Sequence, residues 1–122
     1  MTGKTVLIVD DSETLRAILM FVLEEAGYQV LAGTDGLDAQ QYLDGRDLDL
    51  IITDLHMPKL DGIGFIKAAR AIEKYSQTPI LFLTTDTQSA KKSEARQAGA
   101  TGWIVKPFDQ EKLISAIARV IK

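Results

Sequence analysis

Short apolar runs alternate along this chain with amphipathic stretches long enough to form helices. Five runs have the length and composition of β-strands, and they cover residues 5–9, 28–32, 48–53, 79–84 and 102–105. Three of them are continuously apolar, as expected for strands that are covered on both faces. The alternation therefore predicts repeated β-α-β units around a parallel sheet, which is an α/β fold.

The stretches between these runs have the periodicity of helices. In the first one, apolar residues recur three and four positions apart, at Leu15, Ile18, Leu19, Val22 and Ala26, and Gly27 marks the end. Further helices are predicted over residues 36–43, 62–75, 88–98 and 109–121. Only short loops rich in Gly, Asp or Pro join the elements, so we expect residues 1–122 to form a single domain.

Composition and charge exclude several classes of function. The net charge is −3 and no run of Lys or Arg occurs, which argues against nucleic-acid binding. Cysteine is absent, so neither a disulfide framework nor a thiolate metal site is available. The chain enters its first strand without the apolar segment of a signal peptide, and no apolar run approaches membrane-spanning length. We therefore expect a cytoplasmic protein that does not insert into a membrane.

Polar residues gather where the predicted strands end. Asp10 and Asp11 follow the first strand, Asp54 follows the third, Thr84 and Thr85 lie at the end of the fourth, and Lys106 follows the fifth. Ligands of doubly wound sheets bind beyond the carboxyl ends of the strands, so these side chains are expected to form one site. A single Asp in such a place is usually a turn or helix cap, but capping does not explain the whole set.

Three carboxylates in one site repel one another unless a proton or a cation joins them. Mg²⁺ suits oxygen ligands and commonly lies between carboxylates and a phosphoryl group, and a nearby lysine would neutralise a further phosphoryl oxygen. Asp54 would then act as a nucleophile that accepts the phosphoryl group as an acyl phosphate.

These residues lie in segments that resemble the receiver domain of two-component response regulators, and the resemblance covers essentially the whole chain. The segments are VLIVDDS at 6–12, LIITDLHMPKLDG at 50–62, LTT at 83–85 and WIVKPF at 103–108. Within the family, AGATGWIVKPF at 98–108 is most similar to single-domain chemotaxis regulators. The resemblance implies a flavodoxin-like (βα)5 fold with a five-stranded parallel sheet in the order 2-1-3-4-5.

The resemblance also implies the roles of individual residues. Asp54 would be the phosphoacceptor for a phosphohistidine on a histidine kinase or phosphotransfer domain. Mg²⁺ would be held by Asp11, Asp54 and the backbone carbonyl of His56, with Asp10 helping through water. Thr84, with Thr85 beside it, and Lys106 would contact the phosphate, the Lys106–Pro107 peptide would be cis, and Trp103 would swing inward as Thr84 moves. Most receivers have Tyr or Phe where this chain has Trp103.

Two side chains near the site have more than one reading. The ring of His56, the sole histidine, could act as a base or metal ligand, although a position at the rim of the site is the favoured reading. Asp86 could share that position at the rim or cap the next helix.

Met20 and Phe21 lie off the apolar stripe of the first helix. They are either incidental exposed surface or a docking surface for a helical phosphodonor domain.

The leading functional prediction is a stand-alone, monomeric receiver that is phosphorylated on Asp54 and then presents an altered face around Trp103 to a protein target such as the flagellar motor switch. A receiver that serves only as a phosphate sink is an alternative. In a different class, an aspartate-based phosphohydrolase would use similar residues, but its usual signature is a D-x-D after the first strand, where this chain has the adjacent acids Asp10 and Asp11. A flavin carrier has the same topology, but the phosphate-binding loop rich in Ser, Thr and Gly that such a carrier needs does not follow the first strand of this chain.

Overall fold

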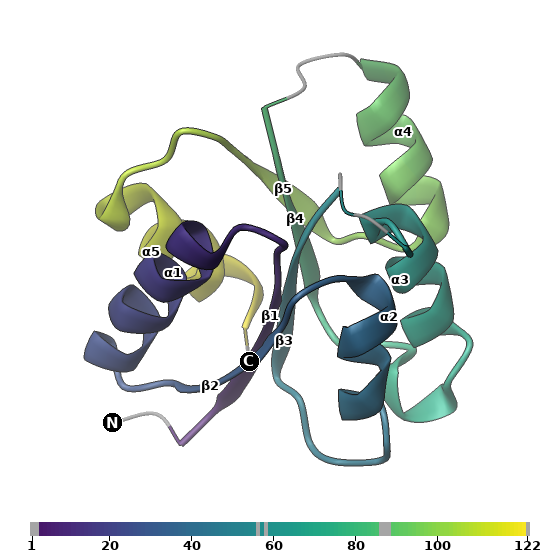
Figure 1. The fold of residues 1–122 in the computed structure, drawn as a ribbon, viewed down its shortest axis with the longest axis horizontal. Coiled ribbons are helices and arrows are strands. Elements are labelled where there is room, and N and C mark those ends of the chain that lie inside the picture. The colour runs from purple at the N-terminus through teal and green to yellow at the C-terminus, as the bar shows by residue number, and fades with distance from the viewer. Residues whose placement is uncertain (1–2, 56, 58, 86–88, 122) are drawn as a thin grey trace.

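The computed structural model describes residues 3–55, 57, 59–85 and 89–121 of the 122-residue chain. Its centre is a sheet of five parallel strands in the order β2-β1-β3-β4-β5 (Figure 1). The strands are β1 (Thr5–Val9), β2 (Gln29–Gly33), β3 (Leu50–Asp54), β4 (Ile80–Thr84) and β5 (Gly102–Val105). The predicted fold class and strand order are therefore confirmed.

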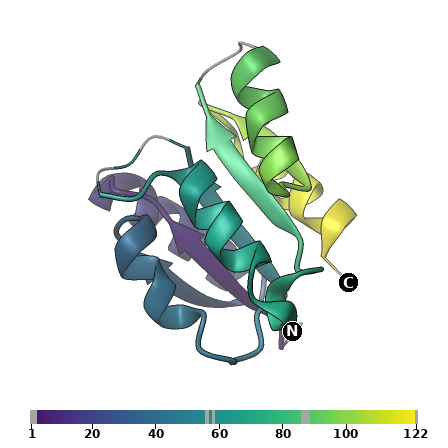
Figure 2. The same cartoon turned by 90° about the vertical axis from the view of Figure 1, so that its right-hand side faces the viewer.

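Helices cover both faces of this sheet. They are α1 (Glu13–Glu25), α2 (Gly36–Ala39), α3 (Gly62–Arg70), α4 (Ser89–Ala98) and α5 (Gln110–Val120), with short 3₁₀ turns η1 (Gln40–Tyr42) and η2 (Glu73–Tyr75). Figure 1 shows α1 and α5 together on one side of the sheet and α2, α3 and α4 on the other. Figure 2 shows α3 and α4 side by side over β4. Among the residues that the structure describes, no helix has the length and apolar character needed to span a bilayer.

Side-chain caps define where four of these helices begin. Ser12, Asp35, Asp61 and Asp109 each accept a hydrogen bond from the backbone N–H three residues further on. Such a cap satisfies a donor that the first turn of a helix leaves unpaired. Each of these four residues lies in the loop that follows a strand, so each cap marks the point where that loop ends and the next helix begins.

The two faces of the sheet build two hydrophobic layers. Val6 and Ile8 of β1 pack toward α1 and α5, whereas Leu7 and Val9 of the same strand pack toward α2 and α3. The alternation follows from the two-residue period of a strand. β3 and β4 are buried along their whole length, which explains the continuously apolar strands of the sequence.

One predicted helix, residues 62–75, is wrong in its second half. α3 ends at Arg70, and the chain turns back through η2. The turn buries the ring of Tyr75, whose hydroxyl donates to the carbonyl of Arg46 at 2.7 Å. Arg70 completes the break by donating hydrogen bonds to the carbonyls of Tyr75 and Gly99. Gly99 lies 29 residues from Arg70, and Arg46 lies 29 residues from Tyr75, so helical periodicity could not reveal these contacts.

The other differences in element bounds are small. The helix predicted over residues 36–43 is one α-helical turn continued by η1. β2 is displaced by one residue from its predicted place, and β3 begins at Leu50 rather than at residue 48. Asp49 precedes β3, and its carboxylate accepts a hydrogen bond from the N–H of Thr5. Asp54 is the last residue of β3 rather than the first after it.

The first helix also departs from its predicted stripe. Ile18, predicted to be in the core, is 48% exposed, whereas Met20 packs partly buried against the core. Phe21 is 63% exposed, as a docking residue would be. The helix faces the layer formed with α5 through Leu19, Val22 and Leu23, which shifts the buried face by part of a turn.

Candidate functional site

Three acidic side chains converge at the carboxyl ends of β1 and β3, as the sequence predicts. Carboxylate oxygens of Asp10, Asp11 and Asp54 lie within 4.8 Å of one another. They meet because β1 and β3 are neighbours in the sheet and run parallel, in register from Val6 opposite Leu50 to Val9 opposite Thr53. The predicted cluster is therefore present in the structure.

The carboxylate of Asp54 contacts the backbone N–H of the next residue and the side chain of a lysine. It is 6% exposed, and its Oδ1 accepts a hydrogen bond from the N–H of Leu55 at 2.8 Å. Its Oδ2 lies 3.0 Å from the Nζ of Lys106, which comes from the loop after β5. This pairing across 52 positions of sequence brings the predicted lysine and the predicted nucleophile together.

Asp10 is the most constrained member of the cluster. Its N–H donates to the carbonyl of Gly33, its own carbonyl accepts from Arg16 at 2.6 Å, and its Oδ1 accepts from the N–H of Ser12 at 2.8 Å. Its Oδ2 is buried and has no hydrogen-bond partner among the described residues, with the Nζ of Lys106 at 3.7 Å. One carboxylate oxygen is thus left directed at the site with only a distant counter-charge.

The electrostatics of Asp10 follow from this burial. Burial raises the pKa of the Asp10 carboxyl above its ordinary value, and the neighbouring charges of Asp54 and Asp11 raise it further. The Ser12 N–H and the charge of Lys106 act in the opposite direction. The cluster therefore carries an excess of negative charge that one lysine does not fully balance.

The oxygens of this cluster fit a hard divalent cation. A buried carboxylate oxygen that has no hydrogen-bond donor among the described residues, beside two further carboxylates, matches the oxygen ligands that Mg²⁺ prefers. The three residues could hold such an ion, and Asp11, which is exposed, leaves one side open to water. His56, whose carbonyl is the fourth predicted ligand, lies outside the described residues, as does Asp86.

The remaining predicted residues surround this cluster from β4 and β5. Thr84 is buried at the end of β4, and its carbonyl accepts a hydrogen bond from the N–H of Lys106 at 2.9 Å. The Lys106–Pro107 peptide is cis, as the resemblance implies. Thr85 is exposed and lies on the wall of a largely apolar hollow of about 450 Å³. That hollow is lined by Leu15, Ile18, Thr85, Lys106, Pro107 and Phe108.

Trp103 does not reach the acidic cluster. It lies on β5 opposite Phe82 of β4, its ring centroid is 6.1 Å from that of Phe82, and it is 38% exposed. The structure thus places this residue on an outer face beside α4, where it contacts Lys92 and Arg96 rather than the acidic residues.

Two residues that support the site carried no predicted role. Arg16 anchors the carbonyl of Asp10 from α1, and only its position six residues after that acid hinted at a contact. Gly62 lies so close to β3 that a Cβ there would be 2.0 Å from the carbonyl oxygen of Asp54. The loop after Asp54 can therefore approach the strand only because residue 62 has no side chain.

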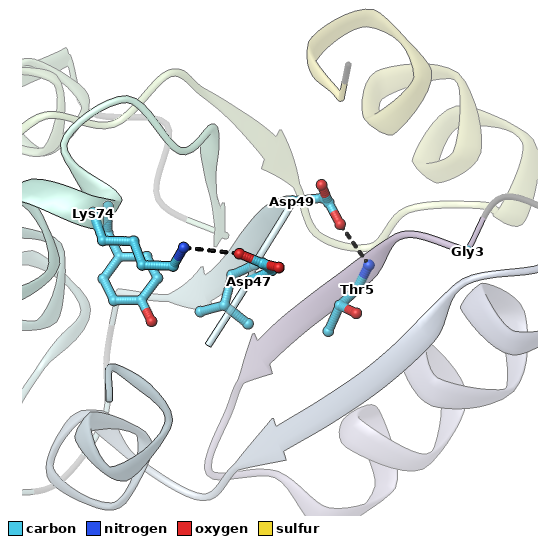
Figure 3. Close-up of a pocket in the computed structure, with 7 residues that line it drawn as sticks. Gly3, Thr5, Asp47, Asp49 and Lys74 are labelled. Carbon is cyan, nitrogen blue, oxygen red and sulfur yellow. Dashed lines mark hydrogen bonds and ion pairs between the residues drawn. The ribbon is translucent and has the colours of Figure 1, made fainter. Parts of the chain in front are cut away.

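A second hollow, of about 370 Å³, lies at the opposite edge of the sheet, where the strands begin (Figure 3). Its charged groups are matched within it: Lys74 pairs with Asp47 at 2.8 Å, and Asp49 accepts from the N–H of Thr5. Lys74 lowers the pKa of Asp47 through this contact. None of the predicted site residues lines this hollow, so we assign it no functional role.

The comparisons with known proteins agree with this geometry. Residues 6–118 match the family model described as the response regulator receiver domain. The chemotaxis protein CheY of Pseudomonas aeruginosa is 35% identical over 118 residues, which cover 96% of this chain and 95% of that protein. The structure of CheY4 of Vibrio cholerae has a TM-score of 0.93 at 43% identity, covering 98% of this chain and 100% of that one.

A second similar structure is the receiver domain of the sensor histidine kinase PA1611 from Pseudomonas aeruginosa, described with a magnesium ion coordinated in its active-site cleft. It has a TM-score of 0.90 at 28% identity and covers 98% of both chains. Together with the match of the family model and the arrangement of strands and acids, these similarities show that the chain belongs to the response regulator receiver domain family, as a CheY-like member.

Proposed function

We propose that this chain is a phosphorylation-controlled protein switch in which Asp54 accepts a phosphoryl group from a phosphohistidine of a histidine kinase or phosphotransfer domain. The observation that carries the proposal is the setting of Asp54, with Lys106 at 3.0 Å and two further carboxylates within 4.8 Å. A buried carboxylate ringed in this way has little role in holding the fold, because it adds repulsion, but it suits the binding of a metal and a phosphoryl group.

In the proposed reaction, a carboxylate oxygen of Asp54 forms a bond to phosphorus while the bond from phosphorus to the imidazole nitrogen breaks. The imidazole leaves with the electron pair of that bond and takes a proton from water. The N–H of Leu55 donates to Oδ1 of Asp54, so the attacking carboxylate is already oriented. Lys106, which lies beside Oδ2, would neutralise a phosphoryl oxygen.

Asp10, Asp11, Asp54 and the carbonyl of His56 would hold Mg²⁺. A bound Mg²⁺ would supply further charge neutralisation at the phosphoryl oxygens. The receiver structure described with magnesium in its active-site cleft supports this assignment, as does the unsatisfied oxygen of Asp10.

The output of the switch would be a changed protein-binding face. Thr84 would close on the new phosphate, and Trp103 on the adjoining strand would change orientation, so the surface around Trp103 would differ between the two states. Relatives named as chemotaxis proteins support a chemotaxis role, with a target such as the flagellar motor switch. We propose that the protein acts as a cytoplasmic monomer.

Phosphoryl labelling tests the proposal. With acetyl phosphate and Mg²⁺, intact-mass analysis should show one added phosphoryl group on the parent, none on Asp54→Asn, and none when the ion is chelated. Asp44→Asn is the matched control, because it removes an exposed acid that pairs only with Arg46 among the residues whose ion pairs the structure describes. Labelling of Asp54→Asn to the level of the parent would disprove the assignment, and steady turnover of small phosphate esters would favour a phosphohydrolase.

A further inference from the structure

The indole of Trp103 faces two cationic side chains of α4. The Nζ of Lys92 lies 4.6 Å from the centroid of the ring, and the guanidinium carbon of Arg96 lies 5.8 Å from it. Both distances are within the range over which a cation is attracted to the face of an aromatic ring, and tryptophan gives the strongest attraction of the aromatic side chains.

These contacts follow from the geometry of α4. Lys92 and Arg96 are four positions apart, so they project from the same face of the helix. They enclose, with Ser93 and Trp103, a surface hollow of about 250 Å³. The ring therefore has Phe82 of β4 beside it at 6.1 Å and two cations of α4 over it.

Ordinary surface behaviour does not account for this convergence. Two like charges at positions i and i+4 repel each other, and long basic side chains at a helix surface gain from extending into water. Instead both cationic groups converge on one ring of a half-exposed residue. The attraction of the indole offsets their mutual repulsion, which makes the arrangement a specific contact of this chain.

We propose that Lys92 and Arg96 are positioning residues that hold the indole of Trp103 in its outward orientation and thereby stabilise the resting state of the switch. The inference rests on the proposed function in one respect, namely that a change at Asp54 has to move this ring. A state in which the ring leaves its outward place must give up both contacts with the cations. The two contacts consequently lower the population of that state.

The size of the effect follows from the usual strength of such contacts at exposed sites. Loss of both should raise the ratio of displaced to outward ring by roughly 5- to 30-fold. If the activated state requires the displaced ring, the apparent affinity for beryllofluoride, a mimic of the aspartyl phosphate, should rise by the same factor as long as the outward state predominates.

The experiment compares the parent with three double variants. Lys92→Gln with Arg96→Gln removes both cations, whereas Lys92→Arg with Arg96→Lys keeps them. Lys67→Gln with Arg119→Gln removes two charges from exposed positions on α3 and α5, and the described contacts of cations with the ring of Trp103 are those of Lys92 and Arg96 instead. Each protein is labelled with 5-fluorotryptophan, which gives a single fluorine signal because Trp103 is the only tryptophan. The position and width of that signal, and the apparent affinity for beryllofluoride in Mg²⁺, are measured for each.

The variant with Lys92→Gln and Arg96→Gln, called the neutral pair below, should show a fluorine signal in the free protein that is shifted toward the position seen with beryllofluoride. This variant should also bind beryllofluoride more tightly than the parent. The charge-keeping and remote variants should stay close to the parent. If beryllofluoride moves the parent's signal but the neutral pair binds it no more tightly than the remote variant, the cations do not hold the ring. If bound beryllofluoride leaves the parent's signal unchanged, the coupling of Asp54 to Trp103 fails instead. The positioning role is then judged in the free protein, where equal signals from the neutral and charge-keeping variants would overturn it.

Discussion

Replacing Asp10 with asparagine should stabilise the Mg²⁺-free protein at neutral pH. The substitution keeps the shape of the side chain and the oxygen that accepts from the N–H of Ser12, and it removes a buried negative charge. It also replaces Oδ2, which has no hydrogen bond among the described residues, with an amide nitrogen. The N–H of that amide can donate toward Asp54. The variant therefore loses repulsion and an unsatisfied acceptor, while Lys106 keeps its closer partner, Asp54.

The magnitude can be set from the buried oxygen of Asp10. A buried polar atom without a hydrogen bond destabilises a fold by about 1–3 kcal/mol, so we expect a gain of that order in the free energy of unfolding. For a chain of this length, 1 kcal/mol corresponds to roughly 4 °C in the melting temperature. The variant should accordingly melt roughly 4–12 °C above the parent when Mg²⁺ is absent.

The pH dependence of this gain has a definite sign. Because burial raises the pKa of Asp10 above its ordinary value of 3.8, the folded chain keeps that proton to a higher pH than the unfolded chain does. The stability that the neutral carboxyl contributes is fully present below pH 3.8 and is lost as the pH rises through the raised pKa. The gap between the variant and the parent should thus be small in acid and widen toward neutral pH.

The assay is thermal unfolding of both proteins across this pH range, with chelator and then with Mg²⁺. The ion binds the folded parent and should stabilise it more than the variant, which narrows the gap. Asp44→Asn is a control that should lower the melting temperature slightly instead of raising it. Arg46 holds the pKa of the Asp44 carboxyl well below its ordinary value, and the substitution removes this exposed ion pair. An Asp10→Asn protein that melts at or below the parent at pH 7 without Mg²⁺ would refute the reasoning, since Lys106 would then outweigh the burial of the charge.

Three further substitutions test other parts of the site and its scaffold. Gly62→Ala should lower stability by about 1–3 kcal/mol in urea unfolding and slow acetyl phosphate labelling, because the new Cβ would meet the carbonyl of Asp54. Arg70→Gln should lower stability by about 1.5–3 kcal/mol, because charge-assisted hydrogen bonds, two of them to the carbonyl of Gly99, are lost. Phe21→Gln should slow transfer from a phosphorylated kinase by roughly tenfold, if its exposed ring docks that partner, while labelling by acetyl phosphate stays unchanged.

Matched variants give these three tests a clear outcome. Gly102→Ala introduces a Cβ that meets only the end of the Leu81 side chain, at 3.3 Å, so a loss equal to that of Gly62→Ala would argue against a special approach at residue 62. Arg119→Gln removes an exposed arginine and should leave stability nearly unchanged. Leu37→Gln changes an exposed apolar residue on α2, and equal slowing by it and by Phe21→Gln would contradict docking on α1.

The layered fold could be predicted from the sequence, and so could the gathering of three acids and a lysine at one end of the sheet. The two-residue and helical periods identify which segments pair in a sheet and which cover it, because burial demands an apolar face on each element. Parallel strands place their carboxyl ends at one edge, so Asp10, Asp54 and Lys106 could be assigned to one site before any distance was known. The order of the strands came from resemblance to receiver domains, and the structure confirms it.

Features that depend on partners remote in the chain could not be predicted from the sequence. α3 stops at Arg70 because that guanidinium donates to a carbonyl 29 residues away, and the period of the sequence continues past this point. Ile18 is exposed and Met20 is partly buried because the angle at which α1 meets its neighbours sets which side faces the core.

The same holds for the energies of the site. A sequence shows that Asp10 is acidic, but its burial and its unsatisfied oxygen depend on Gly33, Ser12 and Arg16 enclosing it. Likewise, nothing in the periodicity of α4 shows that Lys92 and Arg96 meet the ring of Trp103. Local patterns determine which elements form, whereas charge and ring contacts depend on distances that exist only once those elements have packed together.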